Sequence, residues 1–593
     1  MILVFGGTTE GRKAVEVLEE SGNGYYYSTK TGEQDVTLHH GSAINGALDG
    51  EAIRAFCREK GIRLIVDAAH PFASQLHRTV AEVAGALAIP AIRYERIFPE
   101  RDPALTWLDD YAQIPHDIHT LLATTGVQSI RKLKPLESLG VKIVYRILPR
   151  ESSISLARQQ GAADEQLCYY EDGSVIDIEA DAILLKESGL SGGFQEKVDA
   201  ARARGMRILV LKRPETPAGF HTVNGPHGLR RAVERLLPPF FPLKSGLTTG
   251  TCATAASLAA AIRLIRNETH AEVPVVLPDG ETIRVPVNYG DDYASVFKEA
   301  GDDPDVTNGL EIRARAELLG REGAERLRAG DGTPGMARGQ VEICGGEGVG
   351  RFTLPGFDFP PGEPAINKAP REMIRRNLAP FGRALRVTIS VPKGAEIARR
   401  TFNPRLGIEG GISIIGVSGI VKPFSEEAFI ESIRKCMTVA KASGSERVVI
   451  NSGGKSERFV KARYPDLPRQ AFVEYGNYIG WTLRIANELG FRQVTLGVML
   501  GKAVKLAAGH LDTHSRKATM DKSVIARMLQ ESGITIDISD ITLARELWER
   551  IPPTSLSRFA QTVISHCAEY CRPLLPEGSL TILLIDDNGR IYQ

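Results

Sequence analysis

A short apolar run, Ile2–Phe5, leads directly into the glycine-dense string Gly6–Arg12 and then into a helical pattern. A strand that ends in a glycine turn and enters a helix suits a phosphate group, because the helix N-terminus offers unpaired backbone N–H groups and partial positive charge. The spacing is not the standard G-x-G-x-x-G, and the tight turn that any parallel sheet needs is the alternative interpretation. The candidate cofactor contacts are Gly6, Gly7, Thr8, Thr9, Gly11 and Arg12.

Two titratable side chains further along the chain, His70 and Tyr94, could supply a proton to a bound substrate. Bound water is an equal rival as proton source, and His70 could instead only order the turn before Pro71. Arg93 and Arg96 suit substrate carboxylates, because a guanidinium forms paired hydrogen bonds with a carboxylate; surface salt bridges are the alternative. Further phosphate-binding candidates follow later apolar runs: Thr124, Thr125, Gly126, Lys186 and Ser188.

The second half of the sequence contains three other segments that could carry chemistry. A hydroxyl-rich turn precedes the Ala-rich helix predicted over Cys252–Ile262, although Thr side chains at that position also cap helices. The glycine run Gly345–Gly350 would admit a ligand against bare backbone. His510 and His514 have the spacing of a helical metal pair, but no third ligand accompanies them, so no protein-bound metal is predicted. The candidate cofactor contacts are Thr249, Gly250, Thr251, Gly345, Gly346, Glu347 and Gly348.

Apolar runs that end in loops alternate with helical patterns through the first 236 residues. This alternation predicts two Rossmann-like, doubly wound α/β subdomains, at about 1–110 and 111–236. The Pro-rich stretch 237–242 can continue neither a helix nor a central strand and is expected to be a linker. Residues 243–593 are predicted to be an α+β part. The clearest strand predictions are Leu64–Ala69, Ala91–Tyr94, Thr120–Ala123, Ala182–Leu185, Arg207–Leu211, Thr388–Val391 and Gly411–Val417.

Bulk properties exclude several classes of protein. A chain of 593 residues exceeds what one core of about 250–300 residues can organise, so several domains are expected. The net charge of +1 gives no global field that would attract nucleic acid or an anionic membrane. Seven cysteines without a C-x-x-C pair argue against a disulfide scaffold and a structural zinc site. No basic leader or apolar run of about 18 residues is present, so the cytoplasm is the expected compartment.

Four strings in the first part of the chain carry a resemblance: Gly6–Arg12, Asp67–Ala73, Arg93–Arg96 and Lys186–Gly189. On these motifs, residues 1–235 resemble the precorrin-6A reductase family, although Ile97 stands where the family is expected to have a proline. The resemblance implies NADPH and a corrin-type macrocycle held between two Rossmann-like subdomains. It also implies hydride delivery to the C18–C19 double bond of precorrin-6A or its cobalt form. The expected substrate contacts are Phe72, Arg93 and Arg96, and the expected catalytic residues are His70 and Tyr94.

Eight ordered motifs occur in the second part of the chain: Thr248–Thr251, Val306–Gly309, Gly345–Gly350, Gly362–Asn367, Pro370–Ile374, Thr401–Gly407, Gly410–Ser413 and Asp512–Arg516. On these motifs, residues 243–593 resemble the cobalt-precorrin-5B C1-methyltransferase family. This resemblance implies methyl transfer from S-adenosylmethionine to ring carbon C1, which would give cobalt-precorrin-6A. Cobalt would then belong to the substrate and not to the protein. His514 is the catalytic candidate, and the expected substrate contacts are His510, Asp512 and Arg516.

The two implied reactions are consecutive, so the sequence predicts a bifunctional enzyme of cobalamin biosynthesis. Its expected partners are tetrapyrrole substrates, with no nucleic acid and no membrane, and a homo-oligomer is left open. Two alternatives stand beside this prediction. One is a corrinoid-binding carrier without turnover. The other is an unrelated NAD(P)-dependent oxidoreductase in the first half, which would have to explain the string His70–Phe72.

Overall fold

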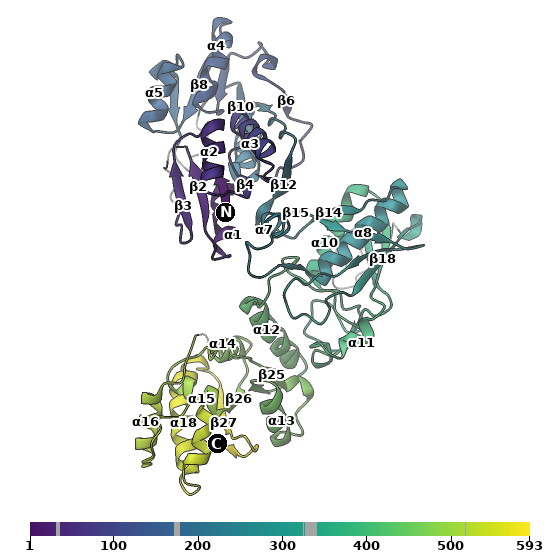
Figure 1. Ribbon diagram of the computed structural model, residues 1–593. Helices are drawn as coiled ribbons and strands as arrows, with labels where there is room; N and C mark the ends of the chain where they lie inside the picture. The colour runs from purple at the N-terminus through teal and green to yellow at the C-terminus, as the bar shows by residue number, and fades with distance from the viewer. Residues whose placement is uncertain (31, 33–35, 171–177, 324, 326–340, 516) are drawn as a thin grey trace. The chain divides into compact units, whose positions relative to one another are not determined.

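The computed structural model describes residues 1–593 except 31, 33–35, 171–177, 324, 326–340 and 516. The described chain divides into two compact units (Figure 1). Unit 1 comprises Met1–Ser245 and Pro274–Arg284, and unit 2 comprises Gly246–Val273 and Val285–Gln593. A search of the described helices finds none with the length and apolar character needed to cross a membrane.

The first sheet of unit 1 contains six parallel strands. In order across the sheet they are β12 (Phe220–Asn224), β5 (Ala91–Glu95), β4 (Leu64–Asp67), β1 (Ile2–Phe5), β2 (Tyr25–Thr29) and β3 (Gly41–Asn45). All four residues of β1 are buried, as expected for a central strand with helices on both faces. Ile2 and Val4 pack on one face and Leu3 and Phe5 on the other, because successive side chains of a strand alternate. The covering helices are α1 (Thr9–Glu19), α2 (Gly50–Glu59), α3 (Ser74–Leu87) and α7 (Gly225–Leu236).

The second sheet of unit 1 is also parallel and six-stranded. Its order is β6 (Thr106–Leu108), β11 (Arg207–Leu211), β10 (Ala182–Lys186), β7 (Thr120–Ala123), β8 (Lys142–Ile147) and β9 (Leu167–Tyr169). One face packs against α4 (Ile130–Ser138) and α5 (Glu151–Gln159), and the other against α6 (Phe194–Ala203). Both sheets therefore have the doubly wound architecture that the alternating pattern predicts, and the predicted fold class is confirmed.

The two sheets of unit 1 do not divide the sequence simply at residue 110, because the first sheet also contains a later strand. Strand β12 pairs with β5 and α7 packs on the first sheet, so the chain leaves that sheet after β5 and returns to it at Phe220. Phe240 and Phe241 anchor the Pro-rich stretch in the same core, whereas its prolines, Pro238, Pro239 and Pro242, are exposed. Unit 1 continues through Ser245.

Unit 2 begins with a mixed sheet of five strands. Their order is β16 (Asn288–Tyr289), β17 (Ala294–Phe297), β18 (Glu311–Leu318), β21 (Leu385–Ser390) and β19 (Val341–Gly345). Helix α8 (Thr249–Arg266) packs against this sheet and against α10 (Lys368–Leu378) (Figure 1). Every residue of α8 from Thr249 to Ile262 is buried, since its many small side chains allow close packing on several sides. Shorter elements of unit 2 are β13 (Gly246–Leu247), β20 (Arg351–Phe352), α11 (Gly394–Ala398), β22 (Ile408–Glu409) and β23 (Ile420–Val421). Strands β14 (Glu272–Val276) and β15 (Thr282–Pro286) form a two-stranded sheet, and most of it, Pro274–Arg284, belongs to unit 1.

The remainder of unit 2 is built on another sheet, in which the first four strands are parallel and the last is antiparallel. Its order is β25 (Phe472–Glu474), β24 (Arg447–Asn451), β26 (Gln493–Met499), β27 (Ser579–Ile585) and β28 (Ile591–Tyr592). Helix α13 (Gly454–Arg463) packs on one face. The opposite core contains residues of α12 (Glu426–Ala442), α14 (Ile479–Glu488), α15 (Leu500–Ala507), α16 (Lys522–Glu531), α17 (Leu547–Arg550) and α18 (Leu556–Cys571).

One strand prediction for unit 2 is wrong, and one pair of histidines lies outside any helix. Gly411–Val417 forms no strand; only isolated bridges occur there, at Ile412 and Ile414. His510 and His514 lie after the end of α15, in a loop, so they do not share a helical face.

Candidate functional site

Gly6 and Gly7 follow β1 where the strand order of the first sheet reverses, with β2 on one side and β4 on the other. Ligands of open α/β sheets bind at such a switch point, outside the carboxyl ends of the strands. The inner side of the turn is closed, because a Cβ on Gly6 would lie 2.3 Å from the Tyr27 ring. The outer side is open: Gly7 is exposed, has φ +84°, and would place a Cβ in free space.

The other predicted residues of this turn belong to the first turn of α1. Thr8 caps the helix, accepting the Gly11 N–H at 3.0 Å, and its hydroxyl donates to Ala68 O. Gly11 is buried against Gly6, whereas Arg12 is exposed. Thr9 opens the helix and is half-buried. The sequence prediction thus falls on a phosphate-type turn, in which Gly11 has a packing role.

Arg93 is not available to bind a substrate carboxylate, so the expected substrate contact of this residue is corrected. Its side chain is buried and donates to Asp67 Oδ1 at 3.0 Å and to Glu95 Oε1 at 2.7 Å. His77 Nδ1 lies 2.5 Å from the second oxygen of Asp67. Burial acts to raise the pKa of Asp67, but the His77 hydrogen bond and the charge of Arg93 hold it below its usual range. These groups form a buried charged network at the ends of β4 and β5.

Arg96 is likewise committed within the protein, and the expectation of a substrate contact is corrected. Its guanidinium donates to Glu10 Oε2 at 2.8 Å and to Ser188 O at 2.7 Å. Ser191 also donates to Glu10. These bonds connect the first turn of α1 to the loop after β10, so the carboxyl ends of the two sheets of unit 1 are joined there. Glu10 was not singled out in the sequence, because a Glu in the first turn of a helix is unremarkable by itself.

The second sheet of unit 1 has its own switch point, between β7 and β10. Thr124 and Thr125 follow β7, where their hydroxyls bond to Leu184 O and Ser129 Oγ, and Gly126 is exposed with φ +81°. Across the switch, Lys186 ends β10 and Ser188 follows it, buried. All five predicted residues therefore lie at one strand edge, although the threonine hydroxyls are used within the protein.

Lys186 and His70 meet near this edge. Lys186 Nζ lies 5.0 Å from the centroid of the Phe72 ring. Burial, and then the charge of Lys132, lower the pKa of Lys186 to about 8. Burial, followed by the charges of Arg96 and Lys186, lowers the pKa of His70 to about 3, so its imidazole is neutral at physiological pH. His70 Nδ1 accepts the Phe72 N–H at 3.2 Å, which leaves the proton of the neutral ring on Nε2.

Tyr94 is placed differently from the proton donor expected. Its side chain is buried in the core formed with α1 and α7, and among the described residues its hydroxyl has no hydrogen-bond partner. Burial, and then the charge of Glu281, raise the pKa of Tyr94. Because Tyr94 is buried in this core, its hydroxyl is not placed to exchange a proton with a macrocycle, so Tyr94 is corrected to a core residue.

In unit 2 the hydroxyl-rich turn is a structural cap of α8, which corrects its assignment as a cofactor contact. Thr249 and Thr251 are buried, and their hydroxyls bond to backbone oxygens of Ile415 and Gly419. Gly250 is buried as well, and a Cβ there would lie 2.8 Å from the Pro370 ring. The geometry therefore supports the alternative interpretation, in which the threonines of this turn cap α8.

The glycine run Gly345–Gly350 approaches protein backbone instead of presenting bare backbone outward, a second correction. A Cβ on Gly348 would lie 1.8 Å from Val391 O, and one on Gly346 would lie 2.3 Å from Ser390 Oγ. Gly345 is packed on Pro364 in the same way. Glu347 is exposed on this turn. Glycine is therefore needed here because another group lies very close, but that group is another part of this chain and not a ligand.

The third predicted group lies after α15. His510 is exposed, His514 is half-buried, and Arg516 lies outside the described residues. Asp512 accepts the His514 N–H at 3.1 Å and pairs with Lys517 Nζ at 2.9 Å. The structure therefore brings His514 and Asp512 together in one loop.

The turn Gly453–Gly454 lies at a further switch point. This turn follows β24, and the order reverses between β24 and β26. Glu474 ends the neighbouring strand β25, and a Cβ on Gly453 would lie 2.3 Å from its Oε1. Glu474 Oε2 lies 3.5 Å from Arg405 Nη1, and its side chain is 27% exposed. The signal that could have found this site is a glycine turn followed about 20 residues later by an acidic residue.

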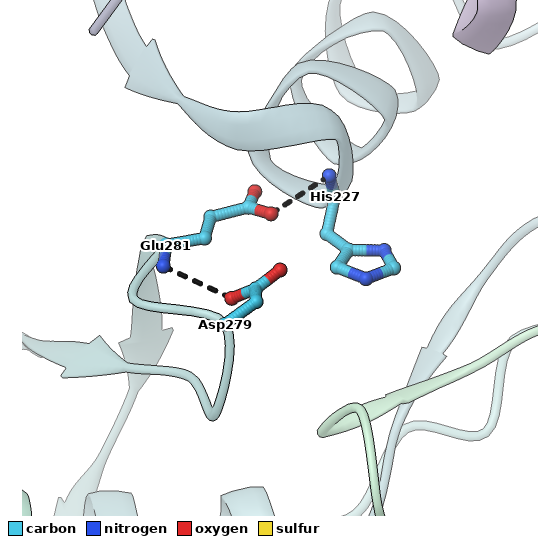
Figure 2. Close-up of side chains that lie close together, drawn as sticks. All are labelled: His227, Asp279 and Glu281. Atoms are coloured by element: carbon cyan, nitrogen blue, oxygen red, sulfur yellow. Dashed lines mark hydrogen bonds between the residues drawn. The ribbon is translucent and has the colours of Figure 1, made fainter. Parts of the chain in front are cut away.

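One cluster of possible metal ligands occurs among the described residues, formed by His227, Asp279 and Glu281, whose ligand atoms lie within 4.8 Å of one another (Figure 2). Glu281 is fully buried and accepts the backbone N–H groups of His227, at 3.0 Å, and of Gly228. Burial raises the pKa of Glu281 to about 8, against the two N–H groups, which favour the ionised form. The arrangement is a cap for the N-terminus of α7, provided by the turn between β14 and β15.

The fold and its strand-end turns define a multidomain α/β protein built on Rossmann-like sheets. Comparison with known families gives two matches. Residues 1–227 match the family model described as Precorrin-6x reductase CbiJ/CobK, and residues 239–423 match the CbiD model. The cobalt-precorrin-5B C(1)-methyltransferase of Prosthecochloris aestuarii is 41% identical over 359 residues, which cover 58% of this chain and 94% of that protein. The chain belongs to the cobalt-precorrin-5B C(1)-methyltransferase family and carries a precorrin-6x reductase part before it, so it is a methyltransferase and an oxidoreductase of cobalamin biosynthesis.

Three further similar proteins are as follows. The methyltransferase of the same name from Geobacillus sp. (strain WCH70) is 38% identical over 357 residues, covering 57% of this chain and 92% of that protein. The crystal structure of the cobalamin biosynthesis protein cbiD from Archaeoglobus fulgidus has 26% identity and a TM-score of 0.25, and covers 49% of this chain and 85% of that one. A CobK precorrin-6A reductase structure has 19% identity and a TM-score of 0.33, and covers 40% of this chain and 97% of that one.

Proposed function

We propose that this chain catalyses two consecutive steps on a cobalt-containing tetrapyrrole. The C-terminal part methylates C1 of cobalt-precorrin-5B with S-adenosylmethionine, giving cobalt-precorrin-6A. The N-terminal part then reduces cobalt-precorrin-6A, or the cobalt-free form, to the 6B compound with NADPH. The observation that carries the proposal is the succession of a reductase match over residues 1–227 and a methyltransferase relative that this chain covers to 94% of its length.

The turn Gly6–Gly7 is the proposed seat of the NADPH pyrophosphate. The residues fit that group, because Gly7 is exposed with free space beside it and the N-terminus of α1 points its N–H groups at the turn. Arg12 is exposed one helical turn further on and is our candidate partner for the 2′-phosphate. When bound, NADPH supplies the hydride; the protein holds it in place and excludes other geometries.

We assign the proton that accompanies hydride transfer to Lys186. A proton must reach the second carbon of the reduced double bond, and the best donor has a pKa near the working pH. The pKa of Lys186 is lowered to about 8, whereas that of His70 is lowered to about 3 and Tyr94 is buried in the core. His70, neutral and with its proton on Nε2, orients a substrate acceptor group without changing charge. Phe72, beside Lys186, offers an apolar surface to the macrocycle.

Methyl transfer makes smaller demands on the protein. The sulfonium donor is already activated and the electron-rich ring carbon is the nucleophile, so catalysis consists mainly of aligning carbon, methyl and sulfur. Asp512 and His514, which share one loop, are our candidates for contacts with the ring or its carboxylates, with His514 as the base. Cobalt enters only as part of the substrate.

Joining the two steps in one chain raises the effective concentration of one site near the other, to about mM for a short connection. The proposal is tested by an anaerobic mass-resolved assay of the full chain on cobalt-precorrin-5B. S-adenosylmethionine alone should add one methyl group, and two hydrogens should follow only when NADPH is present. Absence of methyl gain under all conditions would refute the methyltransferase assignment, and absence of NADPH-dependent reduction of supplied cobalt-precorrin-6A would refute the reductase assignment.

A further inference from the structure

The hairpin formed by β14 and β15 lies largely in unit 1, although the chain on both sides of it belongs to unit 2. Its segment Pro274–Arg284 falls within residues 239–423, which match the CbiD model, and outside residues 1–227, which match the reductase model. A segment that the sequence assigns to the methyltransferase part is therefore packed into the fold of the reductase part.

The turn of this hairpin docks on the N-terminus of α7 through Glu281. The Glu281 side chain is fully buried and accepts the backbone N–H groups of His227, at 3.0 Å, and of Gly228 (Figure 2). Two glycines of α7 leave room for this carboxylate. A Cβ on Gly225 would overlap its carboxyl carbon, and a Cβ on Gly228 would lie 2.9 Å from Oε1. Because N–H groups in the first turn of a helix have no partner inside the helix, the fit satisfies groups that α7 itself leaves open.

The same turn lies along the carboxyl ends of the first sheet. The Thr282 N–H donates to Asn224 Oδ1 at 2.8 Å, and a Cβ on Gly280 would lie 3.9 Å from Ile97 Cδ1. Asn224 ends β12 and Ile97 follows β5, and ligands of open α/β sheets bind at this edge. Ile97 O also accepts the Leu190 N–H at 3.0 Å, from the loop after β10. The hairpin therefore contacts a residue that helps to join the two sheets of unit 1.

Helix α7 connects the hairpin to the turn proposed for NADPH. Leu229 and Val233 of α7 share one core with Val15 and Leu18 of α1, and the two helices are in contact. Helix α1 follows β1 and α7 follows β12, so both helices begin at the same edge of a parallel sheet. A displacement at the start of α7 is therefore transmitted to α1, because packed interiors leave little free space.

We propose that the hairpin β14–β15 is a working part of the reductase, with Glu281 as a positioning residue that fixes α7 and, through α1, the turn that binds NADPH. The proposal rests on the proposed reductase function. It makes one activity of the chain depend on a segment that matches the family of the other activity. A hairpin that served only the fold of its own flanking segments would leave NADPH binding unaffected.

The first test is Glu281→Ala in the full chain, with NADPH binding followed by fluorescence titration. Loss of two buried hydrogen bonds should raise the Kd for NADPH by about 10-fold, whereas methyl transfer to cobalt-precorrin-5B should keep its rate. In the reduction of supplied cobalt-precorrin-6A, the KM for NADPH should rise more than kcat falls. Unchanged NADPH affinity, or an equal loss of both activities, would overturn the proposal.

Two further variants frame this result. Glu281→Gln keeps one acceptor oxygen, so it should raise the Kd only a few-fold, and it replaces the alanine variant if that variant unfolds. Glu268→Ala removes an exposed carboxylate that precedes the hairpin in unit 2, and it should leave both activities unchanged. Loss of NADPH binding in this control would mean that a change of charge alone produces the effect, which would also overturn the proposal.

The second test pairs Glu281 with Gly228. In the unaltered chain, Gly228→Ala places a Cβ 2.9 Å from Glu281 Oε1, so it should lower the unfolding midpoint of unit 1 and weaken NADPH binding. In the Glu281→Ala chain the same substitution meets no carboxylate and should be neutral or stabilising, since alanine favours a helix more than glycine does. Equal effects in both chains would refute the docking. Failure of the unaltered chain to bind NADPH would instead refute the proposed reductase function, and the unfolding midpoints would still decide whether the hairpin docks on α7.

Discussion

The turn after β1 and the run Gly345–Gly350 are both dense in glycine, but different groups approach them. At Gly7 a Cβ would meet nothing within 4 Å, whereas at Gly348 it would lie 1.8 Å from Val391 O. Glycine permits close approach of another group in both places. In unit 2 that group is protein backbone, and in unit 1 the space is left open at a sheet switch point. A glycine run in a sequence therefore indicates close approach without indicating whether a ligand or the chain itself makes it.

The largest effect should come from filling the closed turn. Gly348→Ala forces backbone apart and places a side chain at φ +71°, so we expect unit 2 to lose about 3–5 kcal/mol of unfolding free energy or to fail to fold. Gly410→Ala is the matched control, since its φ is +81° with nothing within 4 Å, and should cost about 1–2 kcal/mol. Calorimetric unfolding measures both, and equal losses would contradict the comparison.

The second-largest effect should come from the buried network of Asp67, His77 and Arg93 in unit 1. Asp67→Asn removes the buried carboxylate that Arg93 and His77 share, while Arg93 keeps its bond to Glu95, so unit 1 should lose about 3 kcal/mol. Because the folded pKa of Asp67 is lowered, its contribution is present above pH about 4 and is lost as the pH falls through the folded value. Unfolding across a pH series should show the two proteins converging in acid. Asp117→Asn, which removes an exposed pair with Arg207, should cost less than about 1 kcal/mol.

At the end of β10 in the second sheet of unit 1, Lys186→Met should slow NADPH-dependent reduction by about 100-fold. In the unaltered chain the rate should fall above pH about 8, because the ammonium form is the donor, and this alkaline decline should vanish in the variant. No decline should accompany His70 between pH 5 and 8, since its pKa is lowered to about 3. Lys132→Met is the control: it should keep the decline and move it to higher pH, because the charge of Lys132 lowers the pKa of Lys186. A decline that survives in Lys186→Met would assign the proton to another group.

The smallest effect should come from Gly7→Ala in the open turn. Strain at φ +84° should cost about 1–2 kcal/mol of stability, as in the Gly410 control. The added methyl also occupies the space proposed for the pyrophosphate, so the Kd for NADPH should rise by about 10-fold or more. Titration of the reduced cofactor by fluorescence measures this directly. Unchanged affinity would mean that the outer side of this turn is not the cofactor seat.

Much of the first unit could be predicted from local pattern. Arg207–Leu211 and Thr120–Ala123 are strands with the predicted bounds, because continuous apolar runs between helices indicate buried parallel strands. The predicted phosphate turns also lie at the switch points of the two sheets. These features depend on a few neighbouring residues and on a topology shared by many sheets.

The remaining features depend on partners distant in sequence. Arg93 and Arg96 have the residue type of carboxylate binders, but Asp67 and Glu10 already bind them inside the protein. The cap of α7 is Glu281, more than 50 residues away and beyond the Pro-rich stretch. Nothing in the local pattern of either segment indicates such pairings.

The most direct test of the comparison between the two turns is a crystal structure of the full chain with NADP⁺. The account predicts the pyrophosphate within hydrogen-bonding distance of the backbone at Gly7 and the N-terminus of α1, with the run Gly345–Gly350 unchanged. A dinucleotide bound against Gly345–Gly350, or one bound in unit 1 with its pyrophosphate remote from Gly7, would contradict it.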